Sequence, residues 1–320
     1  MLRWPNLREA RARAVVLSIC GYALCFAAYA VLFRDLLAAQ TPAAFSHLLL
    51  IAAAAGQIVG TVGLMRLLGL GAQPARNGQP ARWPSVFACF VLSFSLPGAV
   101  LGLPPLALGL LYAATGSAAL GRILNQFYEW LSPGVGAGWL GLGLAQSAGL
   151  LVTVLWFVVK PGLISLRGAG GTAHRLRSTA TGIGAGIVLW MIGNFLQRLT
   201  AASPLSLLGK GWIPVAPTSM NELALGVLIA GLIGPLAEEL FFRGFALRAW
   251  QSSMGSLRAA AATAALFAAA HLSPADFPAL FLVGLGLGWL TLKTNRLWPA
   301  IVAHGTINVT SLCLLYFLRL

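Results

Sequence analysis

Residues 235–243 read Pro-Leu-Ala-Glu-Glu-Leu-Phe-Phe-Arg, residues 267–271 read Phe-Ala-Ala-Ala-His, and residues 304–308 read His-Gly-Thr-Ile-Asn. All three segments lie in apolar surroundings, and they hold two of the seven acidic residues and two of the four histidines of the chain. Charge is costly in hydrocarbon, so an ionisable residue inside a membrane helix is by default a functional-site hypothesis. The three segments therefore predict a functional site in the C-terminal third of the chain.

The composition predicts an integral membrane protein. Hydrophobic residues make up 58% of the chain and charged residues 9%, whereas charged residues make up about 25% of an ordinary soluble domain. The apolar runs are continuous rather than alternating with a period of two, which favours helices over a β-barrel. We therefore predict an all-α fold, a polytopic transmembrane helical bundle of about 8–10 spans, each of roughly 20 residues.

Nine apolar segments follow one another if the block before residue 118 is counted as one crossing. Three prolines, Pro97, Pro104 and Pro105, predict a kink within that block. Residues 121–137 contain Tyr and Trp and predict an interfacial segment. The nine segments are Ala14–Phe33, Ala43–Met65, Ser85–Ala118, Gly138–Val159, Thr179–Leu196, Asn221–Phe242, Arg258–Leu272, Phe277–Leu292 and Leu297–Leu318.

The net charge of +14 has an explanation in membrane topology. Most of the 21 Lys and Arg residues fall in the segments that share a side with the N-terminus, among them the loop from Lys160 to Arg177. The positive-inside rule places that side in the cytoplasm. We expect a multi-pass protein of the cell inner (plasma) membrane with a cytoplasmic N-terminus and the lipid bilayer as its surroundings. The positive residues form no basic face with interleaved aromatics, so nucleic acid is not an expected partner.

Helical geometry gives the two adjacent acids different roles. Glu239 and Arg243 are four residues apart, so they share a helix face and can pair. Glu238 points about 100° away from that face. An unpaired and poorly solvated Glu can act as a general base. For Glu239 and Arg243 a structural ion pair is the favoured reading, and for Glu238 a functional one.

The two histidine segments also have the spacing of one helix face. Phe267 and His271 are four residues apart, and a single His in an apolar helix is more often a structural residue than a catalyst. His304 and Asn308 are also four apart, and two hydrogen-bond donors aimed at one point are what an oxyanion needs. Hydrogen bonding between helices is the alternative for this pair. Together, a base, a His and two donors are suited to hydrolysing an amide with an activated water.

This ordered set of motifs resembles the CAAX-protease and bacteriocin-processing family, which includes the type II CAAX prenyl endopeptidase, an intramembrane glutamic protease. The resemblance extends from about Asn221 to Phe317, and residues 294–299 (Thr-Asn-Arg-Leu-Trp-Pro) are similar to the family's lead-in to its last motif. It implies catalytic roles for four residues and supporting roles for three. Glu238 and His271 would activate the water, and His304 and Asn308 would form the oxyanion site, supported by Glu239, Arg243 and Phe267.

The sequence predicts three regions: residues 1–200 as N-terminal transmembrane helices of unknown role, 201–220 as a connector, and 221–320 as a CAAX-protease-like catalytic core. The expected function is a glutamate-dependent membrane endopeptidase. Its expected partner is a peptide or membrane-anchored protein substrate, which could be lipidated. No cofactor is expected, but Glu238, His271 and His304 could instead bind zinc with an open position for water. The other alternative is a non-enzymatic scaffold, immunity-type protein or transporter, in which the charges form an ion-pair latch.

Overall fold

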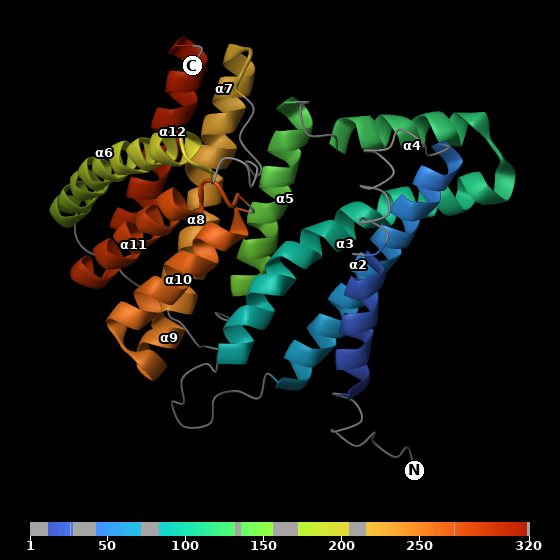
Figure 1. Cartoon of the computed structure of the whole chain (residues 1–320), viewed down its shortest axis with the longest axis horizontal. Helices are drawn as coiled ribbons and strands as arrows, with labels where there is room; N and C mark the ends of the chain where they lie inside the picture. Colours follow the sequence, from blue (N-terminus) through green and yellow to red (C-terminus); the bar gives the residue numbers. More distant parts are fainter. Residues whose placement is uncertain are drawn as a thin grey trace. The chain divides into compact units, whose positions relative to one another are not determined.

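The computed structural model describes residues 12–25, 27, 43–71, 83–131, 136–155, 172–204, 216–271 and 273–318. Every regular element within these ranges is a helix (Figure 1), which confirms the predicted all-α fold. Several predicted features lie outside them. These are the end of the first apolar segment, most of the basic loop after Val159, and residues 205–215 of the connector.

In the described ranges, four helices are long and apolar enough to cross a membrane. They are Leu176–Ala201, Met220–Met254, Phe277–Thr294 and Trp298–Leu318. A bent pair, Cys89–Ala99 and Leu103–Thr115, would count as a fifth span, and shorter apolar helices cover Ala12–Cys25, Ile51–Leu64, Gly143–Val154 and Ser256–Ala270. In chain order these elements follow the nine predicted apolar segments. The multi-pass membrane class is thus confirmed, and the orientation stays a prediction.

The chain divides into two compact units, of which the first comprises residues 1–77 and 87–135. Its described helices are Ala12–Cys25, α2 (Ala43–Gly71), most of α3 (Trp83–Thr115) and α4 (Ala118–Leu131). The three prolines lie inside α3, and the two arms of that helix are bent by 41°. This is the kink expected where a proline removes a backbone donor and its ring crowds the preceding turn.

The second unit comprises residues 78–86 and 136–320. In it, α5 (Gly136–Val154) and α6 (Thr172–Ala201) accompany the C-terminal helices. The predicted region limits at residues 200 and 220 stay predictions. Both helices lie in the predicted N-terminal region, yet they pack directly on the C-terminal helices. Helix α5 packs on the helix that starts at Met220, and α6 packs on α12 (Trp298–Leu318) and α11 (Phe277–Thr294).

One continuous helix of 35 residues, Met220–Met254, passes through the second unit. It consists of α7 (Met220–Gly226), a π-helical segment η3 (Val227–Ile233), α8 (Gly234–Glu239), a second π-helical segment η4 (Leu240–Ala246) and α9 (Leu247–Met254). It begins at Ser219, whose hydroxyl accepts a hydrogen bond from the Glu222 N–H. It ends at Gly255, whose φ of 83° is a left-handed value that glycine adopts readily.

This helix corrects the predicted end of the sixth apolar segment at Phe242. The sequence predicts that the span ends before the charge of Arg243. The helix instead continues to Met254, and Glu239 neutralises that charge inside the protein. The two acids therefore lie near the middle of the long helix and not at its end.

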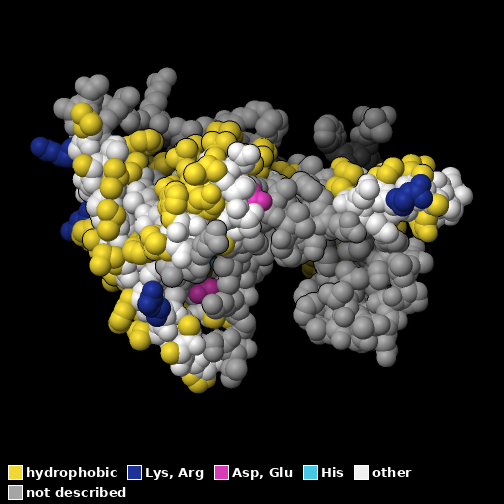
Figure 2. Space-filling view, turned by 90° about the horizontal axis from the view of Figure 1, so that it is seen from above, with side chains coloured by type: hydrophobic (Ala, Val, Ile, Leu, Met, Phe, Trp, Pro, Cys, Tyr) yellow, Lys and Arg dark blue, Asp and Glu magenta, His cyan; other side chains and the backbone are white. Residues whose placement is uncertain are grey.

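Three further helices pack around the middle of the long one. They are α10 (Ser256–Ala270), α11 and α12, and α11 ends at Asn295 in the left-handed conformation with φ 49°. An apolar cluster of Val283, Leu287, Leu290, Ala300 and Ala303 joins α11 to α12. Hydrophobic side chains cover much of the described surface in Figure 2, with few charges between them. On α6, Met191 and Phe195 are 59% and 63% exposed, as expected for a lipid-facing helix.

Candidate active site

The acidic motif lies between the two π-helical segments of the long helix. Pro235 is in the first turn of α8, Glu238 and Glu239 end that helix, and Arg243 lies in η4. A π-helical turn carries one extra residue per hydrogen-bonded ring, so it rotates the side chains that follow it, and such turns are frequent at functional sites. These turns depart from the regular α-helix that the sequence predicts for this segment.

Glu239 and Arg243 form a fully buried ion pair. Arg243 Nη1 donates to Glu239 Oε1 over 2.7 Å, and neither side chain is exposed. Arg243 Nη2 donates to the Gly284 carbonyl of α11 over 2.9 Å. A buried charge is tolerated when it is paired and hydrogen-bonded, and this pair also fixes the long helix to α11.

Aromatic rings enclose the guanidinium group. Arg243 Cζ lies 4.7 Å from the ring centre of Phe267 and 5.8 Å from that of Phe242. The Arg243 Nε and the Glu239 Oε2 are buried without a hydrogen-bond partner. The rings supply a cation–π contact that is stronger when water is excluded.

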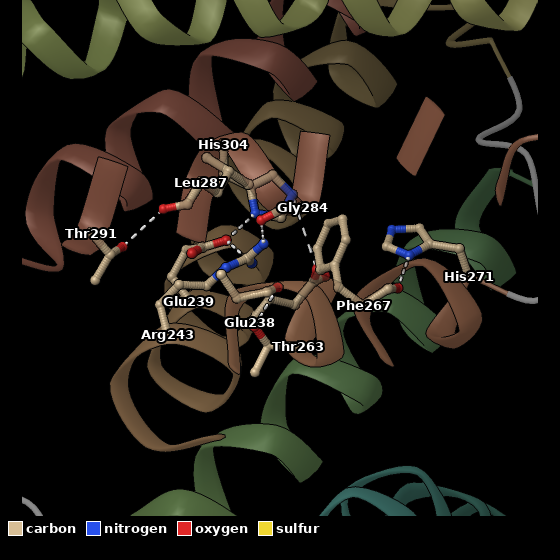
Figure 3. A network of polar contacts seen from close by, with 11 residues as sticks. Glu238, Glu239, Arg243, Thr263, Phe267, His271, Gly284, Leu287, Thr291 and His304 are labelled. Carbon is tan, nitrogen blue, oxygen red and sulfur yellow. Dashed lines mark hydrogen bonds and ion pairs between the residues drawn. The ribbon is translucent and has the colours of Figure 1, made fainter. Parts of the chain in front are cut away.

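His304 connects the two glutamates (Figure 3). Its Nδ1 lies 2.9 Å from Glu239 Oε1, and its Nε2 lies 4.0 Å from Glu238 Oε2. With Glu239 ionised beside Arg243, Nδ1 must carry the proton of the shorter contact. The longer contact exceeds hydrogen-bond range and is of the kind that a water can bridge.

Glu238 differs from its neighbour in having no fixed partner. Its side chain is 25% exposed, yet its Oε2 is buried and makes no hydrogen bond. The geometry thus divides the two acids as the helical-face argument expects: Glu239 is bound to Arg243 and His304, and the Glu238 carboxylate is left available. We call Glu238, Glu239, Arg243 and His304 the acid cluster.

His271 lies at the end of α10 and is separated from His304 by the ring of Phe267 (Figure 3). The Phe267 and His271 ring centres are 4.7 Å apart, and those of Phe267 and His304 are 5.5 Å apart. His271 Nδ1 lies 2.8 Å from the Phe267 carbonyl oxygen, which can only accept, so Nδ1 is the donor. In the neutral ring, Nε2 then keeps its lone pair.

Asn308 binds a different element from its predicted companion His304. Its Nδ2 donates to the Ala230 carbonyl of η3 over 2.7 Å. The two side chains share a face of α12, but their hydrogen bonds go to η3 and to Glu239 respectively.

Ser147 of α5 is a further neighbour of the site, and it is not among the residues that the sequence motifs predict. The Cβ position that Gly234 lacks is 3.8 Å from Ser147 Oγ and 4.0 Å from Glu238 Oε1, so both atoms border the same small space. Ser147 is 4% exposed and donates to the Gly143 carbonyl. The only sequence signal was the polar pair Gln146-Ser147 within an apolar run.

Zinc was the alternative chemistry for Glu238, His271 and His304. Among the described residues, no three His, Cys, Asp or Glu side chains are grouped so that they could hold a metal ion. In particular, the Phe267 ring stands between the two histidines that the zinc hypothesis needs.

Fold and site together define a multi-pass helical membrane protein with a buried Glu–Arg–His cluster at the centre of its C-terminal helices. Residues 220–310 match the model of the family described as Type II CAAX prenyl endopeptidase Rce1-like, which confirms the resemblance seen in the three motifs. The match runs from the start of α7 into α12, and it supports a membrane endopeptidase. A comparison with curated proteins and one with solved structures gave no significant match.

Proposed function

We propose that this protein is an intramembrane glutamate-dependent endopeptidase. The observation that carries the proposal is the difference between two adjacent acids. Arg243 and His304 bind the Glu239 carboxylate, whereas the Glu238 Oε2 is buried without a hydrogen-bond partner and lies 4.0 Å from His304 Nε2. A carboxylate held in a poorly solvated position with no fixed donor is suited to accept a proton.

The proposed reaction is hydrolysis of a peptide bond by an activated water. Glu238 takes one proton from the water while the water oxygen bonds to the scissile carbonyl carbon. The carbonyl oxygen becomes an oxyanion. As the C–N bond breaks, Glu238 returns the proton to the leaving nitrogen, so one water is consumed and a carboxylic acid and an amine are formed. The acid then loses its proton to the amine, which leaves a carboxylate and an ammonium group. General base catalysis of this kind contributes about 10²- to 10⁴-fold.

His304 is suited to stabilise the oxyanion. Its Nδ1 is held by Glu239, and in the protonated ring its Nε2–H points toward the side of Glu238. A charged donor fixed before the reaction begins stabilises developing negative charge without reorganisation. His271, with Nδ1 bound to the Phe267 carbonyl, has Nε2 available as a second acceptor for the attacking water.

The proposed substrate is a peptide or membrane-anchored protein, and a lipidated cysteine near its C-terminus is the first choice because the matched family is one of CAAX prenyl endopeptidases. Two probes separate these substrates: a fluorogenic peptide that ends in a farnesylated CAAX sequence (Cys, two aliphatic residues and a final residue) and the same peptide without the farnesyl group. Cleavage of the first alone would establish lipid recognition.

The decisive variant is Glu238→Gln, assayed on both peptides in detergent or liposomes. It keeps the size and removes the base, so cleavage should fall by at least about 100-fold. Glu222→Gln is the matched control, since it makes the same change on the same helix at an acid whose carboxylate accepts from the N–H and the hydroxyl of Thr218. Wild-type cleavage by Glu238→Gln, or no cleavage by the wild type, would contradict the proposal.

Two alternative functions predict different outcomes in these assays. A scaffold, immunity-type protein or transporter that uses the acid cluster as a latch would cleave neither peptide and would keep its function in Glu238→Gln, because this residue is not part of the buried ion pair. A zinc protease would lose activity with a chelator and regain it with Zn²⁺. We expect the chelator to leave the rate unchanged.

A further inference from the structure

The long helix has an unusual gap in its backbone hydrogen bonding just before the two acids. In η3 the bonds run from one residue to the fifth before it, as in the bond from the Gly234 N–H to the Ile229 carbonyl. The next bond in this register would join residue 235 to the Ala230 carbonyl. Residue 235 is a proline and has no N–H, so the Ala230 carbonyl loses its donor within the helix.

Asn308 of α12 fills this gap. Its Nδ2 lies 2.7 Å from the Ala230 oxygen, and since a carbonyl only accepts, the amide nitrogen must be the donor. An unpaired carbonyl inside a membrane protein is costly. The Asn308 amide therefore replaces the donor that Pro235 lacks.

The backbones of η3 and α12 approach closely at this point. A Cβ on Gly305 would lie 2.7 Å from the Gly231 oxygen, and one on Gly231 would lie 2.6 Å from Val309 Cγ2. Glycine at both positions permits this contact. In a regular α-helix the Gly231 carbonyl would be the partner of residue 235, so both carbonyls affected by the proline face α12.

This contact lies one helical turn from His304 on α12 and about two turns from Glu238 on the long helix. Asn308 follows His304 by four residues in α12, and Ala230 precedes Glu238 by eight residues, with Pro235 between them. The contact therefore fixes the position of α12 along the long helix, and with it the position of His304 relative to the two glutamates. His304 Nδ1 lies 2.9 Å from Glu239 Oε1, and His304 Nε2 lies 4.0 Å from Glu238 Oε2.

We propose that Asn308 is a positioning residue: it binds the Ala230 carbonyl exposed by Pro235 and thereby holds His304 in register with Glu238. This inference rests on the proposed function and differs from the oxyanion role that the family resemblance implies for Asn308. The distinction is testable because the two roles respond differently to a change at residue 235.

The test measures the effect of Asn308→Leu in two backgrounds, with Pro235 intact and with Pro235→Ala. The alanine supplies an N–H that can bond within the helix, so the Ala230 carbonyl no longer needs Asn308. With Pro235 present, we expect Asn308→Leu to lower the thermal unfolding midpoint in detergent by about 2 °C or more and kcat by about tenfold or more. In the Pro235→Ala background, the losses of midpoint and of kcat caused by Asn308→Leu should each be less than half of those seen with Pro235 present.

Pro278→Ala is the matched control background. Pro278 is in the first turn of α11, where the N–H of any residue would lack a helical partner, so it should give no rescue. Equal losses of midpoint and kcat with and without Pro235 would overturn the inference. Rescue of the midpoint but not of kcat would also overturn the positioning role and return Asn308 to the oxyanion site.

The two proposals can fail separately. The unfolding midpoint requires no peptide cleavage, so it tests the contact between Asn308 and Ala230 even if the endopeptidase proposal is wrong. Conversely, the loss of cleavage in Glu238→Gln does not depend on the role of Asn308.

Discussion

Each compact unit of this protein contains a cluster of polar side chains inside the helix packing. The two clusters differ in whether their buried polar atoms have hydrogen-bond partners. In the first unit, Cys25, Gln57, Thr61 and Ser95 form a neutral group that we call the Gln57 cluster. Gln57 Nε2 and Thr61 Oγ1 both donate to the Ser95 carbonyl over 3.2 Å, and Cys25 Sγ donates to Gln57 Oε1 over 3.2 Å. No polar side-chain atom of this cluster is buried without a partner.

The acid cluster of the second unit is charged and incompletely bonded. Glu238 Oε2, Glu239 Oε2 and Arg243 Nε are all buried without a hydrogen-bond partner. A satisfied neutral network holds helices together, whereas an unsatisfied charged one costs stability and is retained where it has a task. The difference is consistent with a structural role for the Gln57 cluster and supports the proposed catalytic role of the acid cluster.

The largest expected effect comes from breaking the buried ion pair. Arg243→Met leaves the Glu239 charge uncompensated, so we expect the free energy of unfolding to fall by about 3–5 kcal/mol. Unfolding by denaturant in detergent would measure it. Adding Glu239→Gln removes the stranded charge and should recover part of the loss. Arg248→Met, at an exposed arginine of the same helix, is the control, and an Arg243→Met protein as stable as this control would refute the account.

A smaller effect is expected from Phe267→Leu. The ring contacts Arg243, Phe242, His271 and His304, so its loss removes a cation–π contact and three ring contacts. We expect a destabilisation of about 1–3 kcal/mol together with slower peptide cleavage, because both histidines lose their common neighbour. Phe277→Leu at the partly exposed start of α11 should change neither quantity appreciably. Unchanged cleavage by Phe267→Leu would show that the ring is only packing.

The smallest effect is expected in the Gln57 cluster. Hydrogen bonds between membrane helices contribute about 0.6 kcal/mol on average and up to about 1.7 kcal/mol, so Gln57→Leu should lower the free energy of unfolding by an amount in that range. Its cleavage rate should equal that of the wild type. A large loss of cleavage at unchanged stability would mean that the first unit takes part in the reaction.

The sequence predicted the local features of the site and missed those that depend on packing. The pairing of Glu239 with Arg243 followed from spacing alone, because residues four apart meet on any helix. The contact of His304 with Glu239 joins residues 65 positions apart, and no local pattern specifies how α12 packs on α8. The spacing of His304 and Asn308 also predicts a common target, whereas tertiary packing directs their hydrogen bonds to different elements.

The residue at which the long helix ends also depends on packing and could not be predicted from the local sequence. A charge usually ends an apolar run, but Arg243 is neutralised by Glu239 and enclosed by aromatic rings, so the helix continues for eleven more residues to Met254. The π-helical turns had no signal in residue preferences. Pro235 was visible in the sequence, but its effect depends on the hydrogen-bond register, which only the structure provides.

The most direct test compares the two adjacent acids, each changed to glutamine, by cleavage of the farnesylated probe peptide and by unfolding midpoint. Glu238→Gln should lose cleavage by at least about 100-fold and keep the wild-type midpoint, because its carboxylate has no hydrogen bond to lose. Glu239→Gln should lower the midpoint, because it weakens the bonds to Arg243 and His304. A Glu238→Gln protein that cleaves at the wild-type rate, or that unfolds as readily as Glu239→Gln, would contradict the assignment of Glu238 as the catalytic base.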